Sequence, residues 1–171
     1  RTLAGYEVLE ILAGIDALQT DAAGRRVGVF GWGEGGRLAL YAAALDPRLQ
    51  AAGVSGYFEP RDHVWQEPLD RNVFGLLRQF GDAEIAALVA PRALVIEAAR
   101  GPEREFPSDG GAPGRLRTPP LDSVRAECAH GEALDPGRRP GERAPVRPVE
   151  SVQRSHAVRR VDQRPAPGVE A

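Results

Sequence analysis

The sequence lacks several residue types, and each absence excludes something. It contains no methionine and no lysine, so all 22 of its basic residues are arginine. Its single cysteine, Cys128, excludes an internal disulfide and a metal site built from cysteines. Because no methionine marks a start of translation, we expect the natural N-terminus to lie upstream of Arg1. The arginine bias is typical of a GC-rich gene.

Charge and hydropathy exclude further classes of protein. The 171 residues carry a formal net charge of -2, and this balance predicts no nucleic-acid partner. No apolar run reaches the length of a membrane-spanning helix, so we expect no membrane association. The hydrophobic content of 42% is sufficient for the core of one domain.

Helical and strand patterns alternate along the first part of the chain. Apolar residues recur at helical spacing from Leu3 to Leu18, and short apolar runs indicate buried strands. This alternation predicts an α/β fold with a mostly parallel sheet and helices on both faces. Functional groups in such a sheet gather beyond the carboxyl ends of the strands. The other predicted elements are helices at Gly35–Leu45, Leu69–Phe80, Asp82–Val89 and Leu121–Cys128, and strands at Val27–Phe30, Ala51–Ser55 and Pro91–Glu97.

The most informative stretch is a strand, a glycine-rich turn and a helix between Arg26 and Tyr41. The turn, Gly31-Trp-Gly-Glu-Gly-Gly36, resembles the Gly-x-Ser-x-Gly-Gly elbow of α/β-hydrolases. In that alignment Gly33 stands where the nucleophilic serine belongs. Glycine has no side chain, so the sequence predicts a protein that is inactive as a serine hydrolase.

Three stretches resemble one bacterial family, the dienelactone-hydrolase and acetyl-xylan-esterase-like proteins. Gly33–Arg48 resembles their elbow helix, Val54–Phe58 their next strand, and Ala90–Glu97 the strand before their catalytic acid. The resemblance implies kinship with carboxylic ester hydrolases and a partial α/β-hydrolase fold, with residues 1–127 as the middle portion of the domain. It also implies that the family's last strand and histidine follow Glu127.

Two carboxylates are candidates for a catalytic role. Glu97 ends a predicted strand in the region of the family's triad acid, and the alternative is a solvated carboxylate at a strand end. Glu34 follows the elbow apex, where its backbone N–H would form half of an oxyanion hole. Its carboxylate is either a nucleophile or base, or a first-turn residue favoured by the helix dipole. We favour the helix-dipole interpretation.

Trp32, Glu34 and Ser55 are the residues expected to contact a small ester-like ligand, because they lie at the ends of the predicted strands. The alternative for Ser55 is a hydroxyl that satisfies the local backbone. His63 precedes Glu97, whereas the usual order places the histidine after the acid. We predict no cofactor, and the acidic residues around His63 are too irregularly spaced for a metal site.

The same turn permits a second interpretation. Gly31, Gly33 and Gly36 also spell the Gly-x-Gly-x-x-Gly fingerprint of Rossmann domains that bind NAD or FAD. That fingerprint needs an acid at the end of the following strand, and the nearest one is Glu59, beyond the strand in a loop. A non-catalytic binding module on a hydrolase scaffold is the third possibility.

The C-terminal part, residues 128–171, changes in character. From Pro136 onward it is rich in arginine and proline and lacks apolar periodicity. Such a segment does not bury enough surface to offset its chain entropy, so we predict a disordered tail. It is either an arginine-rich arm for RNA or acidic partners, or a segment translated out of frame from GC-rich DNA. Scattered acidic residues and the absence of aromatics favour the second origin.

Overall fold

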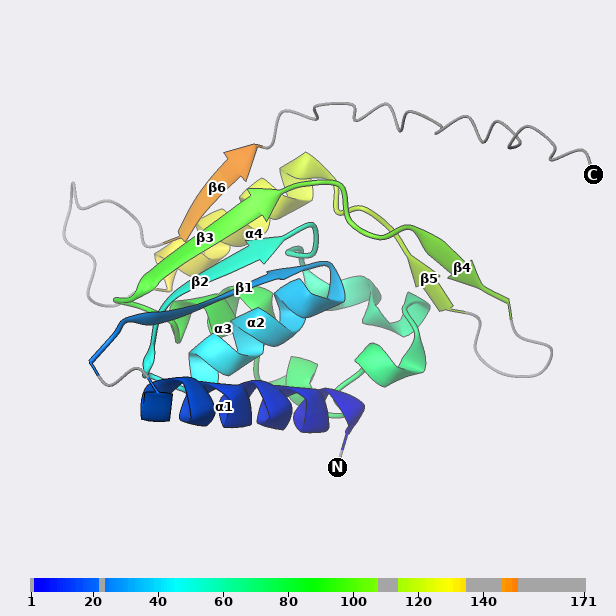
Figure 1. Ribbon diagram of the computed structural model, residues 1–171. Coiled ribbons are helices and arrows are strands. Elements are labelled where there is room, and N and C mark those ends of the chain that lie inside the picture. The colour runs from blue at the N-terminus through cyan, green and yellow to red at the C-terminus, as the bar shows by residue number, and fades with distance from the viewer. Residues whose placement is uncertain (1, 22–23, 108–113, 135–145, 151–171) are drawn as a thin grey trace, which may run out of the picture.

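A four-stranded parallel sheet forms the centre of the fold in the computed structural model (Figure 1). The structure describes residues 2–21, 24–107, 114–134 and the strand at 146–150. The strand order is β1-β2-β3-β6, which confirms the prediction of an α/β fold with a mostly parallel sheet. Trp32, Ser55 and Glu97 are neighbours at the carboxyl ends. The strands are β1 (Val27–Trp32), β2 (Leu49–Ser55), β3 (Ala93–Ala98) and β6 (Val146–Glu150).

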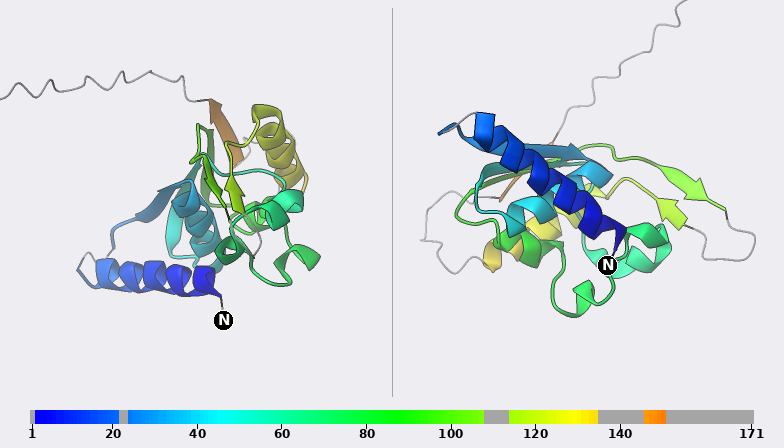
Figure 2. Two further views of the ribbon diagram at one scale, coloured as in Figure 1. Left: turned by 90° about the vertical axis from the view of Figure 1, so that its right-hand side faces the viewer. Right: turned by 60° about the horizontal axis from the view of Figure 1, so that its bottom comes forward.

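The helices of the described residues lie on one face of the sheet, as Figure 2 shows. Helix α2 packs against β1 and β2, α4 packs against β3 and β6, and α3 contacts both of these helices. Helix α1 covers α2. Apolar side chains such as Leu40, Val54 and Ile96 form one continuous core between these helices and the strands. The helices are α1 (Leu3–Asp21), α2 (Glu34–Leu45), α3 (Asp82–Ala87) and α4 (Leu121–Ala133).

The opposite face of the sheet exposes apolar side chains. Phe30 is 69% exposed and Val95 is 42% exposed, and the Phe30 ring lies over Gly53. We predicted helices on both faces, and within the described ranges they lie on one. Strand order explains the difference: each new strand is added on the same side of the last, and right-handed crossovers then place every connection on the same face.

The connection from β2 to β3 is mostly irregular. The helix predicted for Leu69–Phe80 is replaced by two 3₁₀ turns, η2 (Leu69–Arg71) and η3 (Leu76–Arg78), which follow η1 (Arg61–Gln66). Gly75 separates the two turns with a φ of 80°, a left-handed conformation that interrupts a helix. After β3, the strands β4 (Arg104–Phe106) and β5 (Gly114–Leu116) form an antiparallel pair that we did not predict in this proline- and glycine-rich stretch.

Two stretches of the C-terminal part have regular structure within the described residues. Helix α4 continues past the boundary expected at Glu127 to Ala133, and Cys128 is buried in the core. Strand β6 lies within the segment predicted to be a disordered tail and pairs in parallel with β3. Its Pro148 is compatible with the outermost position in the sheet, since an edge strand leaves backbone donors unused. The rest of the predicted tail, 135–145 and 151–171, lies outside the described residues.

Candidate functional site

The turn between β1 and α2 has the backbone of a nucleophile elbow. Gly33, at its apex, has φ 57° and ψ -119°, a strained combination that non-glycine residues rarely adopt. The Gly33 N–H donates to the Ser55 carbonyl over 2.8 Å, and the Gly36 N–H donates to the Gly33 carbonyl over 3.0 Å. Strand β1 therefore passes directly into α2 at Glu34, as in the strained strand-to-helix turn of α/β-hydrolases.

Two other glycines are required by close packing within the turn. A Cβ atom on Gly31 would collide with the backbone of Gly35. One on Gly36 would lie 3.2 Å from the Ser55 carbonyl oxygen. Gly35 itself has nothing within 4 Å of such an atom. The tightly packed or strained glycines of the turn are thus Gly31, Gly33 and Gly36, the three of the Gly-x-Gly-x-x-Gly fingerprint, and not Gly35, which the elbow motif also contains.

Pro102 covers the apex of the elbow. A Cβ atom on Gly33 would lie 2.7 Å from Pro102 Cδ and 2.9 Å from its Cγ. The loop that carries Pro102 is held close, because Gly56 and Gly101 approach so tightly that a Cβ on Gly101 would collide with the Gly56 carbonyl. A side chain at position 33 therefore requires the proline to move.

The predicted residues at the strand ends contact one another or the neighbouring backbone. Ser55 is 2% exposed, and its hydroxyl donates to Glu97 Oε2 over 2.6 Å. The indole N–H of Trp32 donates to the carbonyl of Arg100 over 2.9 Å. The structure thus brings Trp32, Ser55 and Glu97 to one edge of the sheet, and Ser55 is committed to Glu97 rather than free for a ligand.

No histidine of the described residues is bonded to Glu97. His63 lines the hollow above Gly33, and His130 lies 3.5 Å from Glu84 at the contact between α4 and α3. The remaining histidine, His156, lies outside the described residues. The described part of the chain therefore contains the acid that we predicted, without a histidine joined to it.

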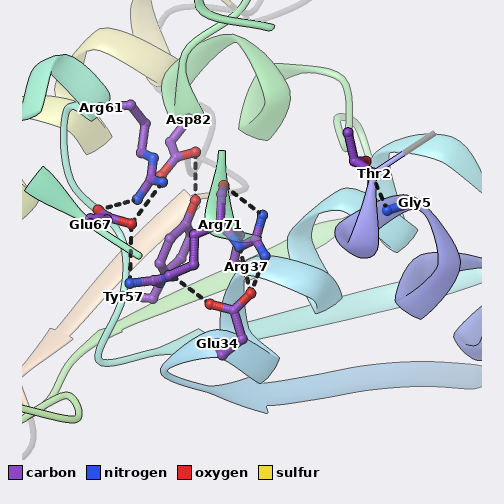
Figure 3. A network of polar contacts seen from close by, with 9 residues as sticks. All are labelled: Thr2, Gly5, Glu34, Arg37, Tyr57, Arg61, Glu67, Arg71 and Asp82. Atoms are coloured by element: carbon purple, nitrogen blue, oxygen red, sulfur yellow. Dashed lines mark hydrogen bonds and ion pairs between the residues drawn. The ribbon is translucent and has the colours of Figure 1, made fainter. Parts of the chain in front are cut away.

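Glu34 takes part in an ion-pair cluster. Its Oε1 accepts hydrogen bonds from Arg37, including one from Nε at 2.8 Å. Its Oε2 forms an ion pair with Arg71, 2.5 Å from Nε, without the alignment of a hydrogen bond (Figure 3). A first-turn carboxylate held by two guanidinium groups fits the structural interpretation of Glu34 better than the role of nucleophile.

A buried charged wall faces the elbow, formed by Tyr57, Arg61, Glu67, Arg71 and Asp82 (Figure 3). Glu67 accepts two hydrogen bonds from Arg61, at 2.8 and 3.0 Å, and lies 3.1 Å from Arg71. The Tyr57 ring lies between the two arginines, 5.4 Å from the guanidinium of Arg61 and 5.7 Å from that of Arg71. These contacts join η1 and η2 to the start of α2.

Asp82, the last residue of the wall, is fully buried. Tyr57 donates to Asp82 Oδ1 over 2.8 Å, while Oδ2 has no hydrogen-bond partner among the described residues. Burial raises the pKa of Asp82 to about 7, although Arg61 acts in the opposite direction. Burial also raises the pKa of Tyr57 well above its ordinary value, with the nearby Asp82 as a second cause.

The hollow above Gly33 has a volume of about 30 Å³ and is partly open to solvent. Burial raises the pKa of Glu59 on its wall, and Arg117 opposes that shift. Sequence reasoning identified Gly33 in this site and missed the arginines, because nothing in the sequence distinguishes a buried arginine from a surface one. The hollow is lined by Gly33, Gly56, Tyr57, Glu59, Pro60, Arg61, His63, Gln66, Glu67, Arg71, Pro102, Arg115, Leu116 and Arg117.

The described residues contain neither a metal-binding cluster nor a membrane-spanning helix. Within the described ranges, no cluster of three or more histidine, cysteine, aspartate or glutamate residues is arranged to hold a metal ion. The helices found in those same ranges are too short or too polar to span a bilayer.

Among known proteins, the fold of this chain is similar to that of two solved structures. No family model matches the sequence, and no curated protein matches it. Among solved structures, the chain is similar to a CE15 glucuronoyl esterase from Teredinibacter turnerae T7901, with a TM-score of 0.53 and 16% identity over 84% of this chain and 41% of that one. It is also similar to a glucuronoyl esterase from Solibacter usitatus, with a TM-score of 0.51 and 17% identity over 84% of this chain and 43% of that one. The chain spans less than half the length of either esterase, and the likeness shows a partial α/β-hydrolase fold.

Proposed function

We propose that this chain is an α/β-hydrolase-fold relative of carboxylic ester hydrolases that binds a small ester-like ligand without hydrolysing it through a serine. The observation that carries the proposal is Gly33, which occupies the apex of the elbow in the strained conformation. The fold is the one shared with the two glucuronoyl esterases. The finer assignment, to the dienelactone-hydrolase and acetyl-xylan-esterase type, rests on the sequence resemblance.

The surroundings of Gly33 support a non-covalent role. Pro102 occupies the space that a serine side chain would need. The nearest strand-end hydroxyl, that of Ser55, is buried and bonded to Glu97. The backbone N–H of Glu34 at the start of α2 keeps the position of an oxyanion donor, because helix N-termini present unpaired N–H groups. The elbow therefore retains groups that bind a carbonyl oxygen and lacks the group that attacks it.

The dinucleotide interpretation is the second candidate. It is favoured by the close packing at Gly31 and Gly36, which the fingerprint requires for a tight turn. Two features weigh against it: Ser55 rather than an acid ends β2, and Pro102 lies where a pyrophosphate would approach Gly33. Quenching of tryptophan fluorescence by NADH or FAD at micromolar concentration would support this alternative over the hydrolase-type ligand.

A fluorophosphonate probe tests the proposal directly, since it labels activated serines. We expect no adduct on the full chain by intact-mass spectrometry, with an active serine esterase in the same tube as the positive control. Stoichiometric labelling, mapped by peptide analysis to Ser55 or any other serine, would overturn the proposal. A Ser55→Ala variant that abolished such labelling would identify the displaced nucleophile.

A further inference from the structure

The hollow above Gly33 is surrounded by more positive than negative groups. Arg61 and Arg71 are largely buried, whereas Arg115 and Arg117 reach the hollow from strand β5 and the residues after it. Histidine aside, the cations outnumber the anions, so a ligand with a negative charge is favoured there. The charged lining residues are Arg61, Arg71, Arg115 and Arg117 against Glu59 and Glu67.

The buried arginines are not fully balanced by glutamates. The side chains of Arg61 and Arg71 are 5% and 10% exposed, and both contact the single carboxylate of Glu67. Arg71 also shares Glu34 with Arg37. Three guanidinium groups thus face two glutamates, and the remaining acid of the cluster is the buried Asp82. Charge interactions are strong in such a desolvated site, so an added anion at its border is stabilised.

The exposed arginines have donors without a hydrogen-bond partner among the described residues. Arg115 is 61% exposed, and its ion pair with Glu105 spans 4.0 Å. Arg117 is exposed and interacts with Glu59 across the hollow. A guanidinium fork matches the two oxygens of a carboxylate. The hollow, about 30 Å³ in volume, has room for a group the size of a carboxylate.

We propose that the hollow above Gly33 binds the carboxylate of a small organic acid, with Arg115 and Arg117 as its direct partners and the buried pair Arg61 and Arg71 as the positive background. The ligand's remaining atoms extend toward solvent past the exposed side of the hollow. This inference rests on the proposed function in one respect, because it requires that position 33 form no covalent bond with the ligand. It adds the charge class of that ligand.

Acetate is the probe for this site. The full chain, labelled with ¹⁵N, is titrated with sodium acetate while sodium chloride keeps the ionic strength constant. We expect saturable shifts of the Gly33 and Glu34 backbone amide signals. Arg117→Gln and Arg115→Gln, both at exposed positions, should each weaken binding by about tenfold, the loss of one charge-assisted hydrogen-bond partner.

Arg26→Gln is the matched control. It makes the same change of charge at an exposed residue just before β1, at the opposite end of that strand from the elbow, and should leave acetate binding unchanged. Absence of saturation in the parent protein, or equal weakening by Arg26→Gln, would overturn the inference. Tighter binding of inorganic phosphate than of acetate would also overturn it, because the ligand class would then be different.

The outcomes separate this inference from the proposed function. Acetate binding together with fluorophosphonate labelling would contradict the proposed function and leave the anion site in place. If neither acetate binding nor labelling were observed, the anion site would be contradicted and the proposed function would stand.

Discussion

The elbow and the charged wall that faces it hold their shapes by opposite means. The elbow is built from backbone, with three glycines at positions where any Cβ atom would collide or be strained. The wall is built from long charged side chains, and Arg61, at 6% exposed, is as buried as the core residues Val8 and Ile85. One region depends on the absence of side chains and the other on their pairing. The elbow therefore keeps its shape without a side chain at its apex, whereas the wall needs its paired side chains.

The largest effect is expected in the wall. Arg61→Ala removes the two hydrogen bonds that Glu67 accepts from Arg61 and the positive charge that acts on the buried Asp82, although Glu67 keeps its ion pair with Arg71. Loss of one partner of a buried ion pair typically costs about 3–5 kcal/mol of unfolding free energy. Urea unfolding measures the loss. Arg78→Ala is the matched control, since Arg78 is exposed in the same connection, and it should stay within about 0.5 kcal/mol of the parent. Equal effects of the two substitutions would show that the wall is not a cooperative cluster.

A smaller effect is expected at the elbow apex. Gly33→Ala places a Cβ in a conformation with φ 57° and against Pro102, at a cost of about 1–3 kcal/mol. Gly75→Ala gives the cost of a Cβ atom at a positive φ in open space, although its ψ of -6° lies in the left-handed helical region, unlike the -119° of Gly33. We expect Gly33→Ala to be the more destabilising, and Pro102→Ala in combination with it to recover the part caused by the contact. If the double variant were no more stable than Gly33→Ala, the contact with Pro102 would have no energetic weight.

A third effect is the pH dependence of stability that Asp82 adds. The pKa of Asp82 rises from 3.8 in the unfolded chain to about 7 in the folded protein, so the folded state binds the extra proton between these values. This contribution to stability is complete below about pH 4 and is lost as the pH rises through 7, with a slope of at most about 1.4 kcal/mol per pH unit.

Asp82→Asn keeps the shape and removes the titration. Urea midpoints measured from pH 5 to 8 should fall less steeply for this variant than for the parent. Parallel curves for the two proteins would contradict a raised pKa at Asp82. Burial also raises the pKa values of Glu59 and Glu127, which add to the slope of the parent. The contribution of Asp82 is therefore the difference in slope between the parent and Asp82→Asn.

Sequence patterns predicted the elbow well because its determinants are local. The apolar run before Gly31, the glycine spacing and the alanine-rich helix after Glu34 all lie within one short stretch. The strand-end positions of Ser55 and Glu97 followed from the same patterns. Their mutual hydrogen bond did not, since it depends on the register between β2 and β3.

The wall was not predictable in this way. Its contacts join residues far apart in the sequence, such as Tyr57 with Asp82 and Glu34 with Arg71. Arginine is usually exposed, so composition alone assigns Arg61 to the surface. The placement of the helices on one face likewise depends on strand order, which periodicity does not reveal.

Hydrolysis of an activated ester tests most directly the proposal that this chain lacks a serine nucleophile. The full chain is incubated with 4-nitrophenyl acetate, and release of nitrophenolate is followed through the first turnover and beyond. We predict neither a burst nor turnover above the buffer rate, because Gly33 supplies no nucleophile and Ser55 is bonded to Glu97. Turnover that Glu34→Gln abolished would make the Glu34 carboxylate the working group, and a burst lost in Ser55→Ala would make Ser55 the nucleophile. The first result would contradict the structural interpretation of Glu34, and the second would contradict the proposal.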